Sequence, residues 1–315
     1  MSGPAPRPRA GRGERGAAAG GTGTPGTPAL ARGVLAACRP RQWTKNLLVL
    51  AAPALAGRIA DPAVMGWTAL AFALFCVAAG GTYLLNDAVD AADDRAHERK
   101  RHRPVASGLV PVPLAAGLGA VLVGLAPLAA LLAQNLRLAA VLLGYLALTV
   151  LYTLWLKNLP VCDIVAVAGC HVLRALAGGL AVGLPITSWF LVVVSLGALL
   201  VVAGKREAEL RNPASGGGRA ALAHYTTGYL AQVRAMASGA VVVTYCLWAL
   251  DEHTGAALGL YTASIVPFVM IVLRLHLLVE RGVGEEPEEI ALRDRPAQVL
   301  LAGLLVLVGL GVHLG

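Results

Sequence analysis

The sequence predicts an all-α, polytopic membrane protein. Of its 315 residues, 57% are hydrophobic and only 14% are charged, and the mean hydropathy is +0.68. Soluble proteins of this size have about 25% charged residues, so an ordinary soluble fold is excluded. Aromatic residues make up only 5% of the chain, which favours membrane helices over a barrel with aromatic girdles. Apolar segments also recur along the chain, and the basic residues are segregated between the loops that join them.

The chain begins with a segment that has no apolar run. Residues 1–33 consist mainly of Gly, Pro, Ala, Thr and Arg. Such a segment cannot bury enough apolar surface to fold, so we expect a disordered basic tail. It also lacks the apolar core of a signal peptide. Residues 34–315 then form one transmembrane domain.

Apolar segments of membrane-spanning length follow the tail. A helix needs about 20 apolar residues to cross the hydrocarbon layer, and nine segments approach or meet this length. The first is interrupted by Pro53 and closed by Arg58. The predicted spans are 44–58, 64–86, 110–133, 137–156, 162–183, 188–205, 229–250, 257–279 and 297–314.

The basic residues orient this bundle. With nine spans, 21 of the 26 Lys and Arg residues lie on the side of the N-terminus. The loops on the other side hold two, Arg58 and Arg137. This asymmetry predicts a cytoplasmic N-terminus. Because topology explains the net charge of +8, we expect no nucleic-acid partner.

An acidic cluster lies where the second span reaches the cytoplasm. Asp87, Asp90 and Asp94 are spaced i, i+3, i+7 after Asn86, which places the three carboxylates on one helix face. Clustered carboxylates repel one another unless a cation neutralises them. Such a set suits Mg²⁺, which completes its shell with water and substrate phosphates. A solvated acidic helix end is the alternative interpretation.

Basic residues follow the acidic cluster directly. Acids beside bases at a membrane-edge cleft suit a metal–diphosphate site, because Mg²⁺ bridges phosphate oxygens and the bases cover the remaining charge. Asp93 points to another face of the helix. The basic residues are Arg95, Arg99, Lys100, Arg101 and Arg103.

A second group of polar residues flanks the turn between the fourth and fifth spans. Tyr152 and Lys157 precede the turn, and Asp163 begins the fifth span. Arg174 follows three helical turns later on the same face as Asp163. An arginine inside a span is costly and faces the bundle interior. We expect it to contact an anionic substrate, and a structural ion pair is the alternative.

Two further groups complete the candidate site. Lys205, Arg206 and Glu209 end the sixth span, and we place the two bases opposite the acidic cluster across one cleft. The alternative is a snorkelling helix end with a local Lys205–Glu209 pair. Lys45 precedes the first span and also enters the cleft in this interpretation, whereas an anchoring cluster explains it otherwise.

These residues resemble a known family. NDAVDAADD at 86–94 fits the NDxxDxxxD signature of the UbiA superfamily of intramembrane prenyltransferases. The resemblance implies a nine-helix bundle with a Mg²⁺-dependent diphosphate site on the cytoplasmic side. Typical members carry a second acidic cluster after the sixth span, and here GKREAEL stands in its place.

That departure is similar to one branch of the superfamily, the phosphoribosyltransferases. The similar segments cover 39–53, 83–108, 173–179 and 203–210. The resemblance implies transfer of the 5-phosphoribosyl group from phosphoribosyl pyrophosphate (PRPP) to a polyprenyl phosphate, such as decaprenyl phosphate, to supply a precursor for cell-wall arabinan. It implies a homotrimer among membrane lipids of the plasma membrane.

The site roles follow from that branch. Asp87, Asp90 and Lys205 are the expected catalytic residues, and Asp87, Asp90 and Asp94 the expected Mg²⁺ ligands. The expected substrate-binding residues are Lys45, Asn86, Lys100, Arg103, Tyr152, Lys157, Asp163, Arg174, Arg206 and Glu209.

Two other functions fit parts of the sequence. A prenyltransferase that moves a prenyl group from prenyl diphosphate to a small acceptor shares the fold, but GKREAEL argues against it. A transporter fits the intramembrane arginines, but the sequence lacks the paired, interrupted hydrophobic segments of inverted repeats.

Overall fold

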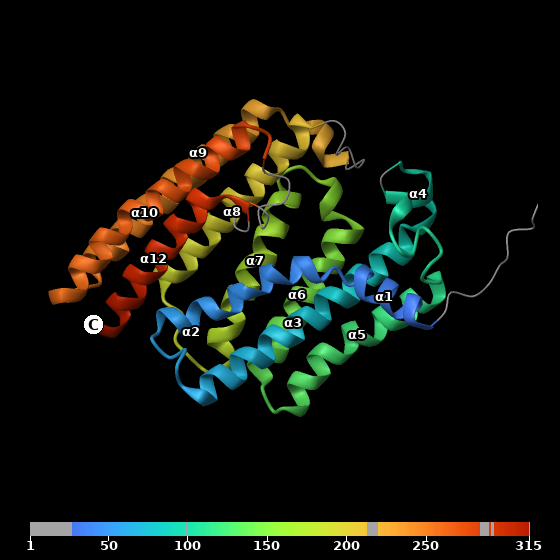
Figure 1. Cartoon of the computed structure of the whole chain (residues 1–315), viewed down its shortest axis with the longest axis horizontal. Helices are drawn as coiled ribbons and strands as arrows, with labels where there is room; N and C mark the ends of the chain where they lie inside the picture. Colours follow the sequence, from blue (N-terminus) through green and yellow to red (C-terminus); the bar gives the residue numbers. More distant parts are fainter. Residues whose placement is uncertain (1–26, 99, 213–219, 284–289, 291–292, 315) are drawn as a thin grey trace, which may run out of the picture.

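The protein is a bundle of membrane-length helices (Figure 1). This computed structural model describes residues 27–315 except 99, 213–219, 284–289, 291–292 and 315. Within these described residues, eight helices are long and apolar enough to cross a membrane. They are α3 (Pro62–Val89), α5 (Val112–Leu132), α6 (Leu136–Leu154), α7 (Cys162–Ala181), α8 (Ser188–Arg211), α9 (Thr227–Asp251), α10 (Gly255–Glu280) and α12 (Arg295–Leu314).

The predicted first span is not a continuous α-helix. Its residues form η1 (Pro40–Leu50), a 3₁₀-helix of 11 residues, and then α2 (Ala51–Leu55) of five residues. Because a 3₁₀-helix rises about 2.0 Å per residue, the two together extend about 30 Å, close to the thickness of the hydrocarbon core. The other eight predicted spans each correspond to one of the eight long helices.

Two glycines explain how this extended segment fits the bundle. A Cβ on Gly178 of α7 would overlap the carbonyl oxygen of Val49 in η1, and a Cβ on Gly179 would lie 2.9 Å from the Cβ of Ala52. The absence of side chains therefore lets η1 and α2 lie directly on the α7 backbone. Arg174, one turn earlier on α7, donates a hydrogen bond to Asn46 Oδ1 at 2.8 Å.

Small residues also bring the long helices together. Gly81 on α3 and Gly119 on α5 face each other so closely that a Cβ on either would lie 2.9 Å from the carbonyl oxygen of the other. Such close backbone approach is typical of helix packing in membranes. Further pairs are α6 with α7, α8 with α9, and α10 with α12 (Figure 1).

Side-chain caps begin four of the helices. Asp61, Asn135, Thr187 and Thr226 each accept a hydrogen bond from a backbone N–H in the first turn of the helix that follows. These residue types are favoured at helix starts for this reason. The capped helices therefore begin within three residues of the predicted positions.

The end of the segment predicted to be a tail is helical. Helix α1 (Thr27–Ala37) begins inside the segment 1–33 that was expected to be disordered. Its apolar residues explain this, since Leu30 and Val34 pack against a buried cluster that includes Val110. Residues 1–26 and the acidic connector Glu285–Glu289 lie outside the described residues.

The bundle has two distinct ends. The polar end is defined here as the one where α3 and α6 end and where α7 begins, and the opposite end is where α5 ends and α6 begins (Figure 1). Short elements cover the polar end. They are α4 (Ala91–Ala96), η2 (Lys100–His102), η3 (Leu156–Asn158) and η5 (Ala220–His224).

Candidate active site at the polar end

Two buried carboxylates lie where α3 gives way to α4. Asp87 is 2% exposed and Asp94 is 3% exposed. Arg103 Nη1 lies 2.7 Å from Asp94 Oδ2 and 3.3 Å from Asp87 Oδ1. Arg39, just before η1, places its Nη2 2.6 Å from the same Asp87 oxygen. Two arginines therefore neutralise two acids that are held close together.

The expected three-carboxylate face is not assembled. The described residues contain no group of three His, Cys, Asp or Glu side chains that could hold a metal ion. The reason is local, since α3 ends at Val89 and Asp90 forms the turn into α4. The helical spacing therefore stops before Asp94, which rejoins Asp87 only through Arg103. Asp93 is exposed on α4, as expected.

A second cluster surrounds Arg206, which is 2% exposed. Its Nε donates to Asp163 Oδ2 at 2.7 Å, and its Nη1 donates to Glu209 Oε2 at 2.9 Å. Its Nη2 donates to the hydroxyl of Tyr152 at 3.1 Å. The structure thus brings four predicted site residues into one contact group from α6, α7 and α8. Glu209 therefore forms an ion pair with Arg206 at 2.9 Å.

Tyr225 belongs to this second cluster, although the sequence did not indicate it. Its hydroxyl donates to Asp163 Oδ1 and accepts from the backbone N–H of Val161. Burial and the bond to Asp163 raise the pKa of Tyr225 well above its usual range. The hydroxyl therefore stays protonated and keeps Asp163 fixed as an acceptor.

The two clusters meet across α6. Asn86, next to Asp87, places its Oδ1 3.5 Å from the hydroxyl of Thr153. Thr153 directly follows Tyr152, which binds Arg206. The acidic end of α3 and the Arg206 cluster therefore face one region of the polar end.

Lysines approach this region from two directions. Lys45 of η1 donates to Gln42 Oε1 at 2.8 Å, and Gln42 also accepts from Tyr83 on α3 at 3.3 Å. Lys45 and Lys205 both lie within electrostatic range of His171 on α7. The placement of Lys205 and Arg206 opposite the acidic cluster across one cleft stays a prediction. Lys100 in η2 and Lys157 in η3 are half-buried at the same end.

Arg174 lies deeper than the two clusters. It is 12 residues into α7, about 18 Å along the helix axis. Its guanidinium binds Asn46 Oδ1, the Tyr145 hydroxyl at 2.9 Å and the Cys170 carbonyl at 3.0 Å. It also lies 4.8 Å from the centre of the Tyr145 ring. The structure therefore gives this arginine neutral partners and separates it from Asp163.

Two other intramembrane arginines hold helices together. Arg234 on α9 binds Glu207 Oε2 at 2.8 Å and Glu280 Oε1 at 2.7 Å. Arg211 binds the same two acids, which joins α8, α9 and α10. Arg274 binds Asp294 at 2.7 Å and so attaches the start of α12 to α10. None of these contacts involves a predicted site residue.

An apolar cavity of about 410 Å³ lies along α3, between Phe72 and Gly80. Trp43 lines it and donates its indole N–H to the carbonyl of Cys38, the residue before Arg39. The cavity follows α3 away from the polar end. Its other lining residues include Leu35, Phe72, Cys76, Gly80 and Leu122.

Arg39 is the most important residue that sequence reasoning missed at the acidic cluster. Its basic neighbours made it look like part of a membrane anchor. Its left-handed backbone conformation, with φ 53° and ψ 63°, turns the chain between α1 and η1 beside Asp87. For Tyr225, the only available signal was a tyrosine close to the start of a span.

Four of the curated proteins similar to this chain share one name. A protein of Mycobacterium tuberculosis named decaprenyl-phosphate phosphoribosyltransferase is 41% identical over 292 residues, covering 91% of this chain and 96% of its own. Proteins of the same name from Corynebacterium glutamicum and Mycolicibacterium smegmatis are each 40% identical and cover 90% of this chain. They are covered over 88% and 93% of their own lengths. The names of these relatives give no oligomeric state, so the homotrimer stays a prediction.

Solved structures share the fold at low sequence identity. A UbiA homolog from Archaeoglobus fulgidus, bound to GPP and Mg²⁺, superposes with a TM-score of 0.67 at 16% identity. The match covers 89% of this chain and 99% of that one. The UbiA prenyltransferase family model matches residues 47–290. This multi-pass membrane protein therefore belongs to the UbiA prenyltransferase family.

Proposed function

We propose that this protein transfers the 5-phosphoribosyl group of PRPP to decaprenyl phosphate and releases pyrophosphate. The observation that carries the proposal is identity of 40–41% to proteins named for this transfer, over about nine-tenths of the chain. The product would supply an arabinose-donor precursor for cell-wall arabinan. The N-terminus and the polar end would face the cytoplasm across the plasma membrane, as the basic residues predict.

The reaction exchanges one C–O bond for another at C1 of the ribose. The bond between C1 and the pyrophosphate oxygen breaks, and pyrophosphate leaves with the electron pair. An oxygen of the lipid phosphate forms the new bond from the opposite face, with inversion. A phosphate monoester is already ionised near neutral pH, so the site needs no strong base. Its main task is to place the two substrates and stabilise the leaving charge.

The acidic cluster fits a Mg²⁺ site completed by the substrate. Asp87 and Asp94 share one guanidinium nitrogen of Arg103, and Mg²⁺ needs only one or two carboxylates when phosphates complete its shell. These two acids would hold the ion, with Asp90 at the adjoining turn and Asn86 beside them. Bound Mg²⁺ supplies positive charge to the diphosphate of PRPP.

Arg39 and Arg103 would then change partners. Both now neutralise Asp87, and both are about 30% exposed, so their guanidinium groups have access to a ligand at the polar end. Arginine binds phosphate oxygens in pairs through its planar donors. These two residues, with Lys100 nearby, would bind the diphosphate and stabilise its developing charge.

The Arg206 cluster would position the ribose of PRPP and the phosphate groups that Mg²⁺ does not bind. Every donor nitrogen of Arg206 already has a protein partner, so it acts as a positioning residue for Asp163, Glu209 and Tyr152. These groups present oxygen atoms suited to ribose hydroxyls. Lys205, Lys45 and Lys157 would contact phosphate groups. The lipid chain would occupy the apolar cavity beside Trp43.

The test follows a label into lipid. Purified protein receives ribose-labelled PRPP and decaprenyl phosphate, with Mg²⁺ or with EDTA, and the lipids are extracted. We expect label in the organic phase only when both substrates and Mg²⁺ are present. A parallel reaction supplies labelled prenyl diphosphate and a small acceptor. Transfer in that reaction, without transfer from PRPP, would overturn the proposal in favour of an ordinary prenyltransferase.

A further inference from the structure

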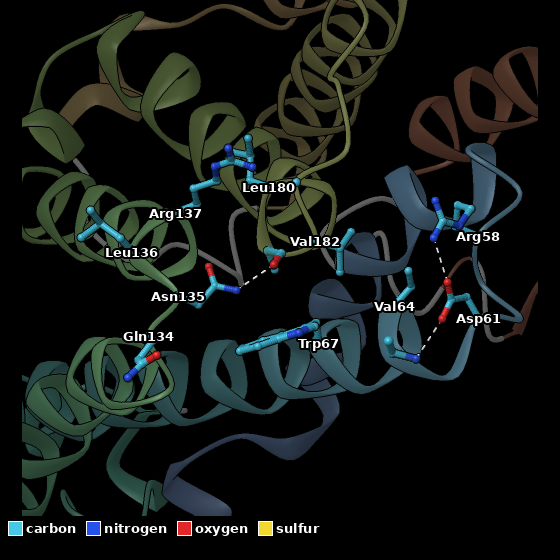
Figure 2. Close-up of a pocket in the computed structure, with 13 residues that line it drawn as sticks. Arg58, Asp61, Val64, Trp67, Gln134, Asn135, Leu136, Arg137, Leu180 and Val182 are labelled. Atoms are coloured by element: carbon cyan, nitrogen blue, oxygen red, sulfur yellow. Dashed lines mark hydrogen bonds and ion pairs between the residues drawn. The ribbon is translucent and has the colours of Figure 1, made fainter.

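A second cavity lies at the opposite end of the bundle, away from the residues of the candidate active site. Its volume is about 560 Å³. Its walls come from the start of α3, the turn between α5 and α6, and the end of α7 (Figure 2). Asn135 ties two walls together, because its amide donates to the Ala181 carbonyl at 2.7 Å and its oxygen caps α6. The cavity is therefore a built feature of the fold.

Its charge sets it apart from the rest of this end. Among the described residues, the Lys and Arg side chains at this end are Arg58, in the turn before α3, and Arg137, in the first turn of α6. Both line the cavity. Arg58 is paired with Asp61 at 2.8 Å. Arg137 has no hydrogen bond or ion pair within the described part of the chain. The lining therefore carries one net positive charge, held by a guanidinium with free donors.

The backbone leaves room for this guanidinium. Gly183 has φ +72°, and a Cβ there would lie 2.8 Å from Arg137 Nη1. Glycine adopts this left-handed conformation without strain, and its missing side chain leaves the space that the Arg137 guanidinium occupies. Figure 2 shows Arg137 and Arg58 on opposite sides of the cavity with Trp67 between them.

The remaining lining is amphipathic. Leu136, Leu180 and Val182 contribute apolar surface, and Gln134 and Asn135 contribute amides. Trp67 stands five residues inside α3, at the depth where tryptophan lies at a membrane–water interface. This lining suits a ligand that has an anionic group to bind Arg137 and an apolar part to pack against the leucine and valine side chains.

We propose that this cavity binds the phosphodiester headgroup of an anionic phospholipid. The cavity is large enough for a glycerophosphate headgroup, and the acyl chains would continue along the lipid-facing sides of α3 and α6. The inference is independent of the proposed reaction, because it concerns the other end of the bundle and needs neither PRPP nor decaprenyl phosphate.

Native mass spectrometry of the full chain tests the site. Protein in detergent is titrated with dioleoyl phosphatidylglycerol and, separately, with dioleoyl phosphatidylcholine. We expect the wild type to prefer phosphatidylglycerol. Arg137→Gln should weaken binding of the tightest phosphatidylglycerol about five-fold, the change expected for one interfacial basic residue, and Arg137→Glu should abolish the preference.

Arg281→Gln is the matched control, because Arg281 is an exposed arginine at the polar end. It should leave the tightest phosphatidylglycerol in place. Equal weakening by Arg137→Gln and Arg281→Gln would reduce the effect to net charge and overturn the proposal. Displacement of the lipid by millimolar inorganic phosphate would assign the cavity to free phosphate instead. Thermal unfolding should be unchanged in both variants, since neither side chain has a structural partner within the described chain.

Discussion

In the described part of the chain, three arginine side chains are buried inside helices, and each has a different set of partners. Arg206 binds two acids and a tyrosine, and Arg234 binds two acids from neighbouring helices. Arg174 binds only neutral oxygen atoms. A buried charge is costly without partners. The partners therefore indicate the role of each arginine: Arg206 organises the candidate site, and Arg234 holds neighbouring helices together.

Part of this could be predicted from single residues. An acid or arginine inside an apolar run is conspicuous, and Asp87, Asp163 and Arg206 were identified in this way. Their partners were harder to predict because each contact joins positions far apart in the chain, such as Arg39 with Asp87. Spacing along one helix also misled, since the break at Asp90 is invisible to a periodic pattern.

The acidic cluster yields a prediction at single-residue scale. Asp94→Asn keeps the shape of the side chain but removes the charge that would hold Mg²⁺. We expect the rate of phosphoribosyl transfer to fall by about 10²-fold or more, as for other lost electrostatic contacts to a reacting group. The rate is measured as labelled lipid formed per minute at saturating PRPP.

Asp93→Asn is the matched control for that prediction. Asp93 is the preceding residue and is exposed on the same short helix. Its variant should keep a rate within about two-fold of the wild type, as surface substitutions do. Similar rates in both variants would remove Asp94 from the metal site.

At the scale of elements, length and hydropathy predicted the long helices well. Eight expected spans correspond to α-helices, because about 20 apolar residues leave few other structures available in lipid. The first predicted span, 44–58, is the exception, because it is not a continuous α-helix. It packs instead on the bare backbone of Gly178 and Gly179 in α7, which lies more than 100 residues downstream, so no local pattern could reveal this contact.

The contact between η1 and α7 gives a prediction at this scale. Gly178→Ala places a methyl group against the Val49 carbonyl. We expect the free energy of unfolding to fall by about 1–3 kcal/mol, the cost of overpacking, even though alanine favours helices. Thermal unfolding in detergent measures the change.

Gly144→Ala on α6 provides the comparison. A Cβ at Gly144 meets no atom within 4 Å, so this variant should keep or slightly raise the midpoint of unfolding through helix propensity. If Gly178→Ala is as stable as Gly144→Ala, η1 does not lie directly on α7.

The whole molecule is polarised along its axis. The polar end holds two clusters of acids and bases, whereas the opposite end carries two arginines around one cavity. The sequence predicted this division through the positive-inside rule. It could not predict the cavity, because Arg58, before α3, and Arg137, at the start of α6, line one cavity only when α3, α6 and α7 are packed.

Orientation in the membrane is the prediction at this scale. In a variant that lacks the five native cysteines, Ser107→Cys lies at the polar end and Ala60→Cys at the opposite end, both at exposed positions. A membrane-impermeant maleimide should label Ala60→Cys in intact cells. It should label Ser107→Cys only after the cells are permeabilised, and the reverse pattern would contradict a cytoplasmic polar end.

The docking of η1 on α7 also sets an order for biogenesis. Asn46 and its partner Arg174 are 128 residues apart in the chain. A ribosome that adds 5–20 residues per second needs about 6–26 s to synthesise this stretch. During that interval the first segment has left the ribosome without the surface on which its 3₁₀ turns rest. The contacts of this segment with α7 therefore form only after α7 has been synthesised.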